Sequence, residues 1–403
     1  MAKKILFVDL FTHYGYGTTL VQKIAASFEA AGYIPVILDV DSPNAAQTLQ
    51  QCVRNKKEFL FSFSTGWGIT EASKISGKYI HQWLEIPHYA SFADHPLYKQ
   101  EFIDFRLIDT LYGFTDETQV EFCKAFFYKK GNYSVFPHFS LIEVDEPISE
   151  DEFAKRGKRV FFSGGATIME RAWSANISAT LQSKAVCSLK KSGIDIEGLI
   201  DNLLCKEGDH PPLDITLVDQ LRSHPTLSGA SDQLIANVFT DIDVVIRAIK
   251  RRRALEALNG IELAIAGSGW DKCDYLDRQS TLFLGKQKYL ECEQSRKNYQ
   301  ISLNTSHGQP KALHDRILHA SCQGQVVVTD DSEFVRENFN SGNLVFYSIK
   351  EKNIRSRVEK ILNDDQLRFK MARTGQDYMR KGLHSSDQAA KRVLQQLKEY
   401  ELI

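Results

Sequence analysis

The sequence predicts an α/β protein with two doubly wound parallel sheets joined by a long helix. Three observations lead to this fold class. Short apolar runs alternate with stretches of helical period through both halves of the chain. Several apolar runs are continuous, which is typical of strands buried on both faces of a parallel sheet. Between the halves, residues 231–259 form one long helical pattern, which Ser228 or Ser231 can cap and Gly260 can end.

The composition is that of a globular protein of two or three domains. The chain has 403 residues, of which 43% are hydrophobic and 25% charged, with a formal net charge of −1. So small a charge gives no basis for broad nucleic-acid binding, which needs a basic surface. The seven cysteines are scattered without a Cys-x-x-Cys pair, so we expect reduced thiols in a cytoplasmic protein. No apolar run reaches the roughly 20 residues of a membrane span, which leaves peripheral membrane contact open.

The first predicted domain, residues 1–230, opens with an apolar strand, a helix and a second strand within residues 3–41. The loop after the first strand contains Gly15 and Gly17 but lacks the third glycine of a dinucleotide fingerprint. We therefore expect this loop to reach a substrate rather than to bind NAD. Strands and helices alternate along the rest of the domain, and residues 159–221 are expected to add a strand and a helical annex.

Polar residues follow the predicted strands of this domain, where ligands gather in doubly wound folds. The residues at these positions are His13, Gly15, Gly66, Trp67, Asp94, His95 and His138. Asp94 or His95 could serve as a general base, and His138 is a further candidate for that role. For each of them, a loop residue in a proline-rigidified turn is the structural alternative.

The second predicted domain, residues 260–385, contains the most unusual stretch of the chain. Residues 299–331 are predicted to form a strand, a polar loop, a helix from Lys311 to Cys322 and a buried strand, which is a parallel crossover. The loop and the first helical turn would lie at the carboxyl end of a strand, where backbone N–H groups and the helix dipole favour an anion. A final helix within residues 386–403 is expected to pack back near the first domain.

Groups suited to bind phosphate collect in this second domain. Glycines after a strand let backbone N–H groups approach a phosphate, cations pair with its oxygens, and hydroxyl groups donate hydrogen bonds. The residues with these properties are Gly267, Ser268, Gly269, Lys286, Thr305, Ser306, Lys311, Arg316 and His319. Each of these groups also has a structural explanation without a ligand. Residues 267–269 could form a plain strand-to-helix turn, Arg316 could pair with Asp330 or Asp331, and the basic residues of the helix could form a solvated face.

Several short motifs follow one another in a characteristic order. They are RRRALEAL, IAGSGW, ISLNTS, HDRILHASCQGQVVVTDD and FNSGNLVFYSIKE, with weaker support from SFADHPLY and VFPHFS in the first half. In this order they resemble GT-B glycosyltransferases, and the second half resembles the group-one-like transferases of the spore-maturation CgeB type. The resemblance implies two Rossmann-like domains facing a cleft, with a nucleotide-activated sugar on the C-terminal side. It also implies a glycan or lipid-linked glycan acceptor on the N-terminal side, no bound metal and no cofactor besides the sugar nucleotide.

The sequence departs from the commonest pattern of that fold at two positions. Many retaining members carry two glutamates eight positions apart, one near the sugar and one at the ribose, where this chain has Lys311 and His319. Cations there favour a donor with its own carboxylate, so the resemblance points to CMP-Kdo and a lipopolysaccharide acceptor such as O-antigen. The alternative is that these cations face the diphosphate of a UDP- or GDP-hexose.

The catalytic mechanism also has alternatives. Asp232, at the start of the long helix, could be the nucleophile of a retaining double displacement, as in bacterial β-Kdo transferases, or a carboxylate placed there by the helix dipole. An inverting enzyme would use Asp94 or His95 as its base. A non-catalytic module that binds sugar nucleotides or carbohydrate is the remaining alternative, either free or within a larger glycan-assembly protein.

Overall fold

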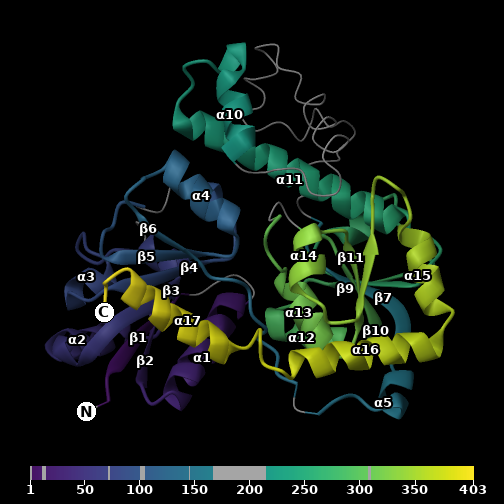
Figure 1. Ribbon diagram of the computed structural model, residues 1–403, viewed down its shortest axis with the longest axis horizontal. Helices are drawn as coiled ribbons and strands as arrows, with labels where there is room; N and C mark the ends of the chain where they lie inside the picture. The colour runs from purple at the N-terminus through teal and green to yellow at the C-terminus, as the bar shows by residue number, and fades with distance from the viewer. Residues whose placement is uncertain are drawn as a thin grey trace. The chain divides into compact units, whose positions relative to one another are not determined.

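The structure is a computed structural model that describes residues 2–10, 15–70, 73–99, 105–144, 146–166, 215–306 and 310–403. The chain divides into two compact units, Met1–Leu141 with Gly382–Ile403, and Ile142–Lys381. Each unit contains one six-stranded sheet flanked by helices (Figure 1). The predicted fold class, an α/β protein with two Rossmann-like domains, is confirmed. Within the described part of the chain, no helix combines the length and apolar character needed to cross a membrane.

The first unit has the strand order β2-β1-β3-β4-β5-β6, with parallel pairing throughout. The strands are β1 (Lys4–Asp9), β2 (Ile34–Asp39), β3 (Phe59–Thr65), β4 (His88–Phe92), β5 (Thr110–Phe114) and β6 (Asn132–Val135). The helices are α1 (Tyr16–Ala30), α2 (Ala45–Arg54), α3 (Ile80–Leu84), α4 (Glu117–Phe126) and α17 (Ser386–Glu399), with short turns η2 (Lys56–Glu58), η3 (Gly66–Ile69) and η5 (Pro96–Lys99).

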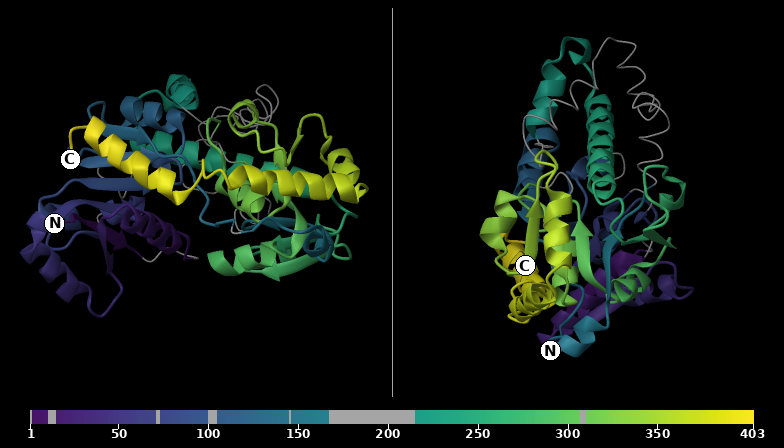
Figure 2. Two further views of the ribbon diagram at one scale, coloured as in Figure 1. Left: turned by 60° about the horizontal axis from the view of Figure 1, so that its bottom comes forward. Right: turned by 90° about the vertical axis from the view of Figure 1, so that its right-hand side faces the viewer.

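Helix α17 brings the end of the chain back to the first unit, where it packs along α1 (Figure 2). Its Gln396 side chain accepts a hydrogen bond from Tyr89 Oη and donates one to Val135 O, both at 2.7 Å. Ser27 Oγ of α1 donates to Ser386 Oγ at 2.8 Å. These contacts join the last helix to α1, β4 and β6, so the first unit is complete only with residues from both ends of the chain.

The second unit has the strand order β12-β11-β10-β7-β8-β9, again with parallel pairing. The strands are β7 (Gly157–Ser163), β8 (Leu263–Ala266), β9 (Thr281–Gly285), β10 (Tyr299–Asn304), β11 (Val326–Asp330) and β12 (Leu344–Tyr347). The helices are α5 (Glu150–Ala154), α10 (Ile215–Ser223), α11 (Asp232–Glu256), α12 (Tyr289–Arg296), α13 (Asp315–Cys322), α14 (Glu333–Asn338), α15 (Ile354–Leu362) and α16 (Asp365–Met379), with turns η6 (Pro225–Leu227) and η7 (Trp270–Lys272).

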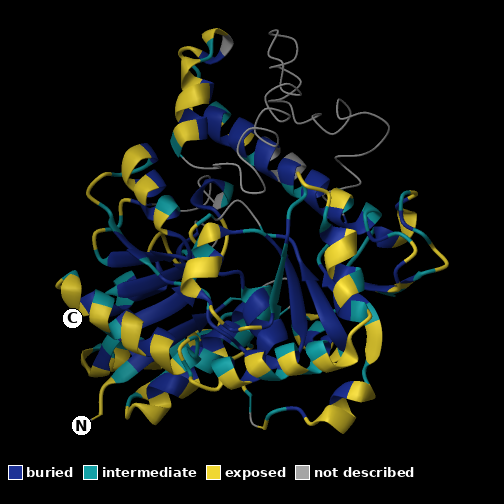
Figure 3. Cartoon of the chain, turned by 45° about the vertical axis from the view of Figure 1, so that its right-hand side comes forward, coloured by how far each residue is buried: buried dark blue, intermediate teal, exposed yellow. Residues whose placement is uncertain are grey.

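The division of the chain differs from the predicted boundary near residue 230. Strand β7, expected in the first domain, pairs with β10 on one side and β8 on the other, inside the second sheet. Val160, Phe161 and Phe162 are fully buried there. Figure 3 shows the sheets coloured mostly as buried. An apolar run shows that a strand is buried on both faces but does not show which sheet it joins. Most of the predicted annex, at residues 167–214, lies outside the described residues, as does His13.

Helix α11 occupies the stretch that the sequence assigned to a connecting helix. Ser231 Oγ caps it by accepting the Leu234 N–H at 3.3 Å. Towards the other end, Ala248, Ala254 and Leu255 are buried in the hydrophobic core beneath the second sheet. This half of α11 therefore belongs to the packing of the second unit.

Two of the buried histidines of the first unit, His81 and His88, lie against each other. His88 is 2% exposed, with Nδ1 2.8 Å from Ser62 Oγ and Nε2 2.9 Å from Ser64 Oγ. His81 stacks on it with 4.8 Å between ring centroids. Burial, reinforced by His81, lowers the pKa of His88 well below its ordinary value of 6.5.

We predict that the first unit loses stability as the pH falls below about 6.5. Unfolded His88 takes up a proton there, whereas folded His88 does so only at lower pH, so protons favour unfolding by up to about 1.4 kcal/mol per pH unit. His88→Gln should flatten this dependence. Hydrogen exchange of the β3 and β4 amides between pH 5 and 8, corrected for intrinsic rates, measures it for this unit. Equal pH slopes in both proteins would contradict the prediction.

Candidate functional site

A buried ion pair joins α11 to the carboxyl edge of the second sheet. Lys250 Nζ lies 2.6 Å from Asp330 Oδ2 at the end of β11, and donates to Ser306 O after β10 at 3.1 Å. The Lys250 and Asp330 side chains are 4% and 0% exposed. The Ser306 N–H donates to Asp330 Oδ1 at 2.8 Å. Lys250 and the backbone N–H of Ser306 therefore hold the loops of this edge in place. Ser306 is one of the residues predicted to bind phosphate.

Two glycine-containing loops after β7 and β8 are held together by backbone contacts. The Gly164 N–H donates to Ala266 O at 2.9 Å, and Trp270 Nε1 donates to Gly164 O at 2.6 Å. A Cβ atom at Gly267, where φ is 143°, would lie 2.0 Å from Gly164 O, so this position requires glycine. The Gly267 N–H donates to Gly285 O at 2.8 Å, which makes Gly267 a loop-closing residue. The predicted ligands Ser268 and Gly269 are half-buried at the same edge.

Two guanidinium groups flank the loop after β7. Arg316 Nη1 donates to Ser163 O at 2.8 Å, and Arg251 Nη1 donates to Gly165 O at 2.9 Å. Burial, together with the positive charges of Arg316 and Arg247, lowers the pKa of Arg251 to about 9. Burial also lowers the pKa of Arg316. Cations kept close together and away from water create a positive potential suited to an anion.

His319 is buried in a side-chain network and is 1% exposed. Its Nδ1 lies 3.7 Å from Glu293 Oε1, and its Nε2 lies 3.3 Å from Tyr289 Oη. Although burial raises the pKa of Glu293, the charges of Arg296 and His319 outweigh it and bring that pKa to about 2. The predicted cation at position 319 therefore faces a carboxylate from α12.

The remaining predicted donor residues are spread over the same unit. Lys286 follows β9 and Lys311 precedes α13, both exposed, while Thr305 is 1% exposed. Helix α13 begins at Asp315 rather than at the predicted Lys311. The reason is that His314 has an extended backbone, with φ −68° and ψ 137°, and its Nδ1 accepts the Arg316 N–H at 3.2 Å as the helix cap.

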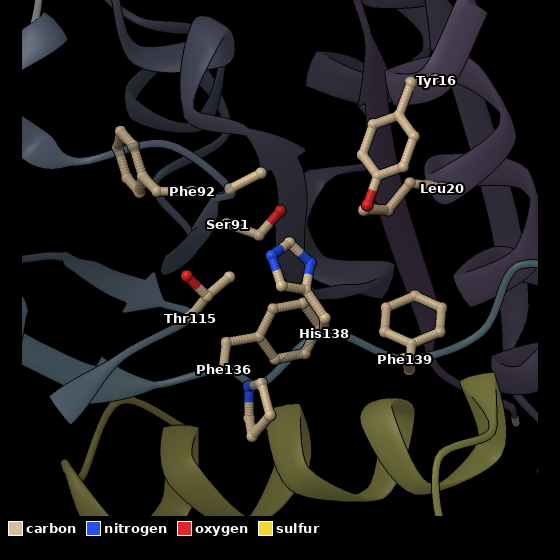
Figure 4. Close-up of a pocket in the computed structure, with 10 residues that line it drawn as sticks. Tyr16, Leu20, Ser91, Phe92, Thr115, Phe136, His138 and Phe139 are labelled. Carbon is tan, nitrogen blue, oxygen red and sulfur yellow. The ribbon is translucent and has the colours of Figure 1, made fainter. Parts of the chain in front are cut away.

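A small pocket lies at the carboxyl edge of the sheet in the first unit (Figure 4). Its walls are Tyr16, Leu20, Ser91, Phe92, Ala93, Thr115, Phe136, Pro137, His138 and Phe139. Figure 4 shows the Ser91 and Thr115 hydroxyl groups and the His138 ring around the same space. None of these wall residues is a carboxylate, a lysine or an arginine, so the pocket suits an uncharged group that forms hydrogen bonds.

The other two predicted bases lie just after β4. Asp94 is exposed, whereas His95 is 5% exposed and packs edge-on against Phe122, with ring centroids 4.8 Å apart. His95 Nδ1 accepts the Leu97 N–H at 3.3 Å. These contacts give His95 the role of holding the turn into η5, and leave Asp94 and His138 as the more accessible bases.

Asp232, the predicted nucleophile, is the first residue of α11. It is exposed and forms a 2.6 Å ion pair with Arg222 of α10. Lys250 comes 18 positions later on the same helix (250 − 232), which corresponds to about 27 Å along its axis. The structure therefore does not bring Asp232 to the edge where Lys250, Arg251 and Arg316 lie.

Lys250 and Arg251 were not predicted as site residues from the sequence, where the basic run at residues 251–253 served only as part of the motif RRRALEAL. The signal was its position near the end of a long helix that leads into a strand and a Gly-Ser-Gly loop. As for metals, no group of three or more His, Cys, Asp or Glu side chains in the described ranges is arranged to hold an ion.

Comparison with known proteins assigns this architecture to a fold. Residues 247–395, which run from α11 into α17, match the family described as Glycosyl transferase-like. An alpha-glucosyltransferase in complex with UDP-glucose and DNA is similar over 100% of both chains, with 8% identity and a TM-score of 0.56. The DNA-modifying enzyme beta-glucosyltransferase gives 11% identity and a TM-score of 0.54, covering 98% of this chain and 99% of its own.

A second structure of this kind, T4 phage BGT in complex with UDP-glucose, has 11% identity and a TM-score of 0.52 over 98% of this chain and 99% of that one. No curated protein sequence matches the chain. The chain therefore has the GT-B fold of glycosyltransferases. Its second unit carries most of the segment that matches the Glycosyl transferase-like family, including Lys250, Arg251 and Arg316.

We predict that Lys250 and Asp330 depend on each other for stability. Lys250→Met leaves the Asp330 carboxylate buried without a counter-ion and should destabilise the second unit by about 3–5 kcal/mol. Adding Asp330→Asn, which keeps an acceptor for the Ser306 N–H, should recover much of that loss. Urea unfolding of both single variants and the double variant measures the coupling energy. Losses that simply add would show that the two charges do not interact.

Proposed function

We propose that this chain is a glycosyltransferase that binds a nucleotide-activated sugar at the carboxyl edge of its second unit. The observation that carries the proposal is that two cations, buried Arg251 and half-buried Arg316, donate to carbonyl groups at the end of β7 and in the loop after it. Both arginines lie inside the segment with the family match. Transfer of a sugar releases a nucleotide, whose growing negative charge must be stabilised. Arg251 and Arg316, next to the half-buried Ser268 and Gly269 loop, are suited to that task.

A UDP- or GDP-hexose is the donor that we favour. A UDP-hexose and CMP-Kdo carry the same double negative charge, so the number of cations does not separate them. The preference for an acidic sugar rested on Lys311 and His319, and His319 is buried against Glu293. The UDP-glucose in the alpha-glucosyltransferase and T4 phage complexes is in keeping with a UDP-sugar. CMP-Kdo is the second candidate, which the exposed Lys311 favours.

The acceptor, in this proposal, is an uncharged hydroxyl of a bacterial surface glycan, such as lipopolysaccharide O-antigen, bound by the first unit at the cytoplasmic face of the membrane. The pocket with Ser91, Thr115 and His138 has hydrogen-bonding groups and no charged wall residue. One similar enzyme was solved with DNA, but a net charge of −1 does not favour a phosphate backbone.

The chemistry that we propose is inversion, with His138 or Asp94 as the base. The base removes the proton of the acceptor hydroxyl, and the acceptor oxygen attacks the anomeric carbon. The bond from that carbon to the phosphate breaks, and the nucleotide leaves. Retention through Asp232 is less favoured, because this carboxylate pairs with Arg222 and lies about 27 Å from Lys250 along α11.

We predict that UDP raises the melting temperature of the protein more than CMP does. A ligand that binds only the folded state stabilises it by mass action. A thermal-shift panel of CMP, UDP and GDP at equal concentrations, with uridine as the control for the base, makes the comparison. Selective stabilisation by CMP would replace the hexose donor with the ulosonic acid. A panel without any stabilisation would contradict the proposal as a whole.

We predict that His138→Asn or Asp94→Asn lowers turnover by roughly two to four orders of magnitude, because one of them removes the acceptor proton. UDP binding should be unchanged in both, since both side chains belong to the first unit. Release of UDP from the sugar nucleotide measures turnover, with glycan, duplex DNA or water as acceptor. A loss confined to Asp232→Asn would instead support the retaining mechanism, and transfer to DNA alone would overturn the glycan acceptor.

A further inference from the structure

The amino edge of the first sheet, where its strands begin, carries three exposed isoleucines. Ile34 is the first residue of β2 and is 44% exposed. Ile108 precedes β5 and is 77% exposed, which makes it the most exposed large apolar side chain of the described residues. Ile75 is 44% exposed and lies beside this edge, because its carbonyl accepts Trp83 Nε1–H of α3 at 3.0 Å, and α3 ends just before β4. Single exposed apolar residues are normal on a protein, whereas three along one edge form a candidate binding surface.

The loop that carries Ile108 is held on both sides by hydrogen bonds and packing. Its neighbour Leu107 packs against the apolar core of the unit, and the Thr110 N–H donates to Leu107 O at 3.3 Å. Asn132 Nδ2, at the start of β6, donates to Ile108 O at 2.9 Å. Leu107 therefore occupies the core position, and the fixed backbone leaves the Ile108 side chain in solvent. Water around so exposed an isoleucine is unfavourable, and an apolar partner that covers the side chain removes that cost.

Ile75 is presented by a two-residue turn. The N–H groups of Ile75 and Lys78 donate to each other's carbonyl oxygens, at 2.8 and 3.1 Å. Ser76 and Gly77 between them have φ angles of 48° and 79°, as a tight hairpin turn requires. Lys78 Nζ lies 5.3 Å from the centre of the Trp83 ring. An isoleucine beside an indole and a lysine with an apolar stem suits the boundary between lipid and water.

Basic side chains outnumber acidic ones along this edge, which comprises residues 3–4, 31–34, 54–58, 75–78, 85–87, 106–109 and 128–131. The basic ones are Lys3, Lys4, Arg54, Lys56, Lys57, Lys78, Arg106, Lys129 and Lys130, and the acidic ones are Glu58, Glu85 and Asp109. Each carboxylate has a partner, which is Lys4 for Glu58, Lys56 for Glu85 and His81 for Asp109. Lys57, Lys129 and Lys130 are exposed, and none of them forms an ion pair with a carboxylate of the described residues. The edge therefore has an excess of positive charge beside its isoleucines.

We propose that this amino edge docks on an anionic lipid surface, where the isoleucines enter between the headgroups and the lysines meet the lipid phosphates. The charge of the edge is complementary to such a surface, which attracts each nearby lysine. The isoleucines distinguish lipid from a soluble polyanion, because a polyanion has no apolar phase to receive Ile75 and Ile108. The inference deepens the proposed function and rests on it for the membrane-linked acceptor.

The docked orientation also limits which acceptor reaches the first unit. The pocket with Ser91 and Thr115 lies at the carboxyl edge, at the opposite end of the same strands. The five residues of β4 separate the two edges by about 16 Å. An acceptor anchored in the same membrane must span that distance, so the sugar that is extended is a distal one of a glycan chain rather than the sugar next to the lipid.

Co-sedimentation of the full chain with vesicles tests this surface. The vesicles consist of phosphatidylcholine, either alone or with about a third of phosphatidylglycerol. The wild-type protein should bind only the anionic vesicles, and less tightly as salt is added. The double variant Lys129→Gln and Lys130→Gln should bind them roughly ten- to thirtyfold more weakly, because two lysines near the lipid are lost. Ile108→Ser should bind roughly three- to tenfold more weakly, because less apolar surface enters the lipid.

Matched control variants remove the same chemical groups elsewhere. Lys360→Gln with Lys370→Gln removes two exposed lysines of α15 and α16, and Ile37→Ser removes an isoleucine that is 43% exposed within β2. Both should bind anionic vesicles within roughly twofold of the wild type. Melting temperature and UDP affinity should stay at wild-type values in every variant, so that a loss of vesicle binding is not a loss of folding.

Three outcomes would overturn the docking surface. They are a wild-type protein that ignores anionic vesicles, control variants that lose as much binding as the edge variants, and Ile108→Ser that binds as tightly as the wild type. The last outcome would mean that charge alone is recognised, as a soluble polyanion would do. A wild-type protein that docks on vesicles but releases UDP from no sugar nucleotide would overturn the proposed function and leave the docking surface in place.

Discussion

The buried contact between Lys250 and Asp330 is the interaction on which the rest of the second unit's functional edge depends. A lysine and an aspartate with almost no exposure are stable only as a pair that is also hydrogen-bonded. Here the pair also binds the Ser306 carbonyl and amide, so that one contact links α11, β11 and the loop after β10. Because Arg251 is the next residue of α11, the ion pair also sets the position of Arg251 beside the loop after β7.

The fold class was accessible from the sequence, because burial on both faces of a parallel sheet leaves a direct mark on each strand. The run Val326–Asp330 is apolar apart from its last two residues, and β11 is where such a run predicts a strand. The membership of β7 was not accessible in this way. Its burial is the same in either sheet, and only pairing over a long sequence distance, from β7 to β8 and β10, places it in the second one.

The residues of the candidate site divide in the same way, into those that the local sequence predicts and those whose role depends on partners far away in the sequence. The glycines after β8 and the cation Arg316 were predicted because turn chemistry and charge can be recognised locally. The role of His319 was not predictable, since its partner Glu293 is 26 positions earlier (319 − 293) and belongs to another helix. Arg251 was missed for a related reason. A basic run on a helix is usually solvated, and only the burial of one arginine out of three distinguishes the site from a surface patch.

The two ways of burying cations in this unit explain why the edge suits a ligand. Around Glu293, the carboxylate accepts hydrogen bonds from Arg296 and Gln323 and lies close to His319, so these positive charges face a negative one. Around the loop after β7, Arg251 has only a backbone carbonyl as acceptor, and positive charges outnumber the carboxylates near it. Such an arrangement reduces the stability of the free protein, and an anion would restore it. In the function that we propose, a phosphate binds at this carboxyl edge of a Rossmann-like sheet and supplies the negative charge that Arg251 and Arg316 lack in the free protein.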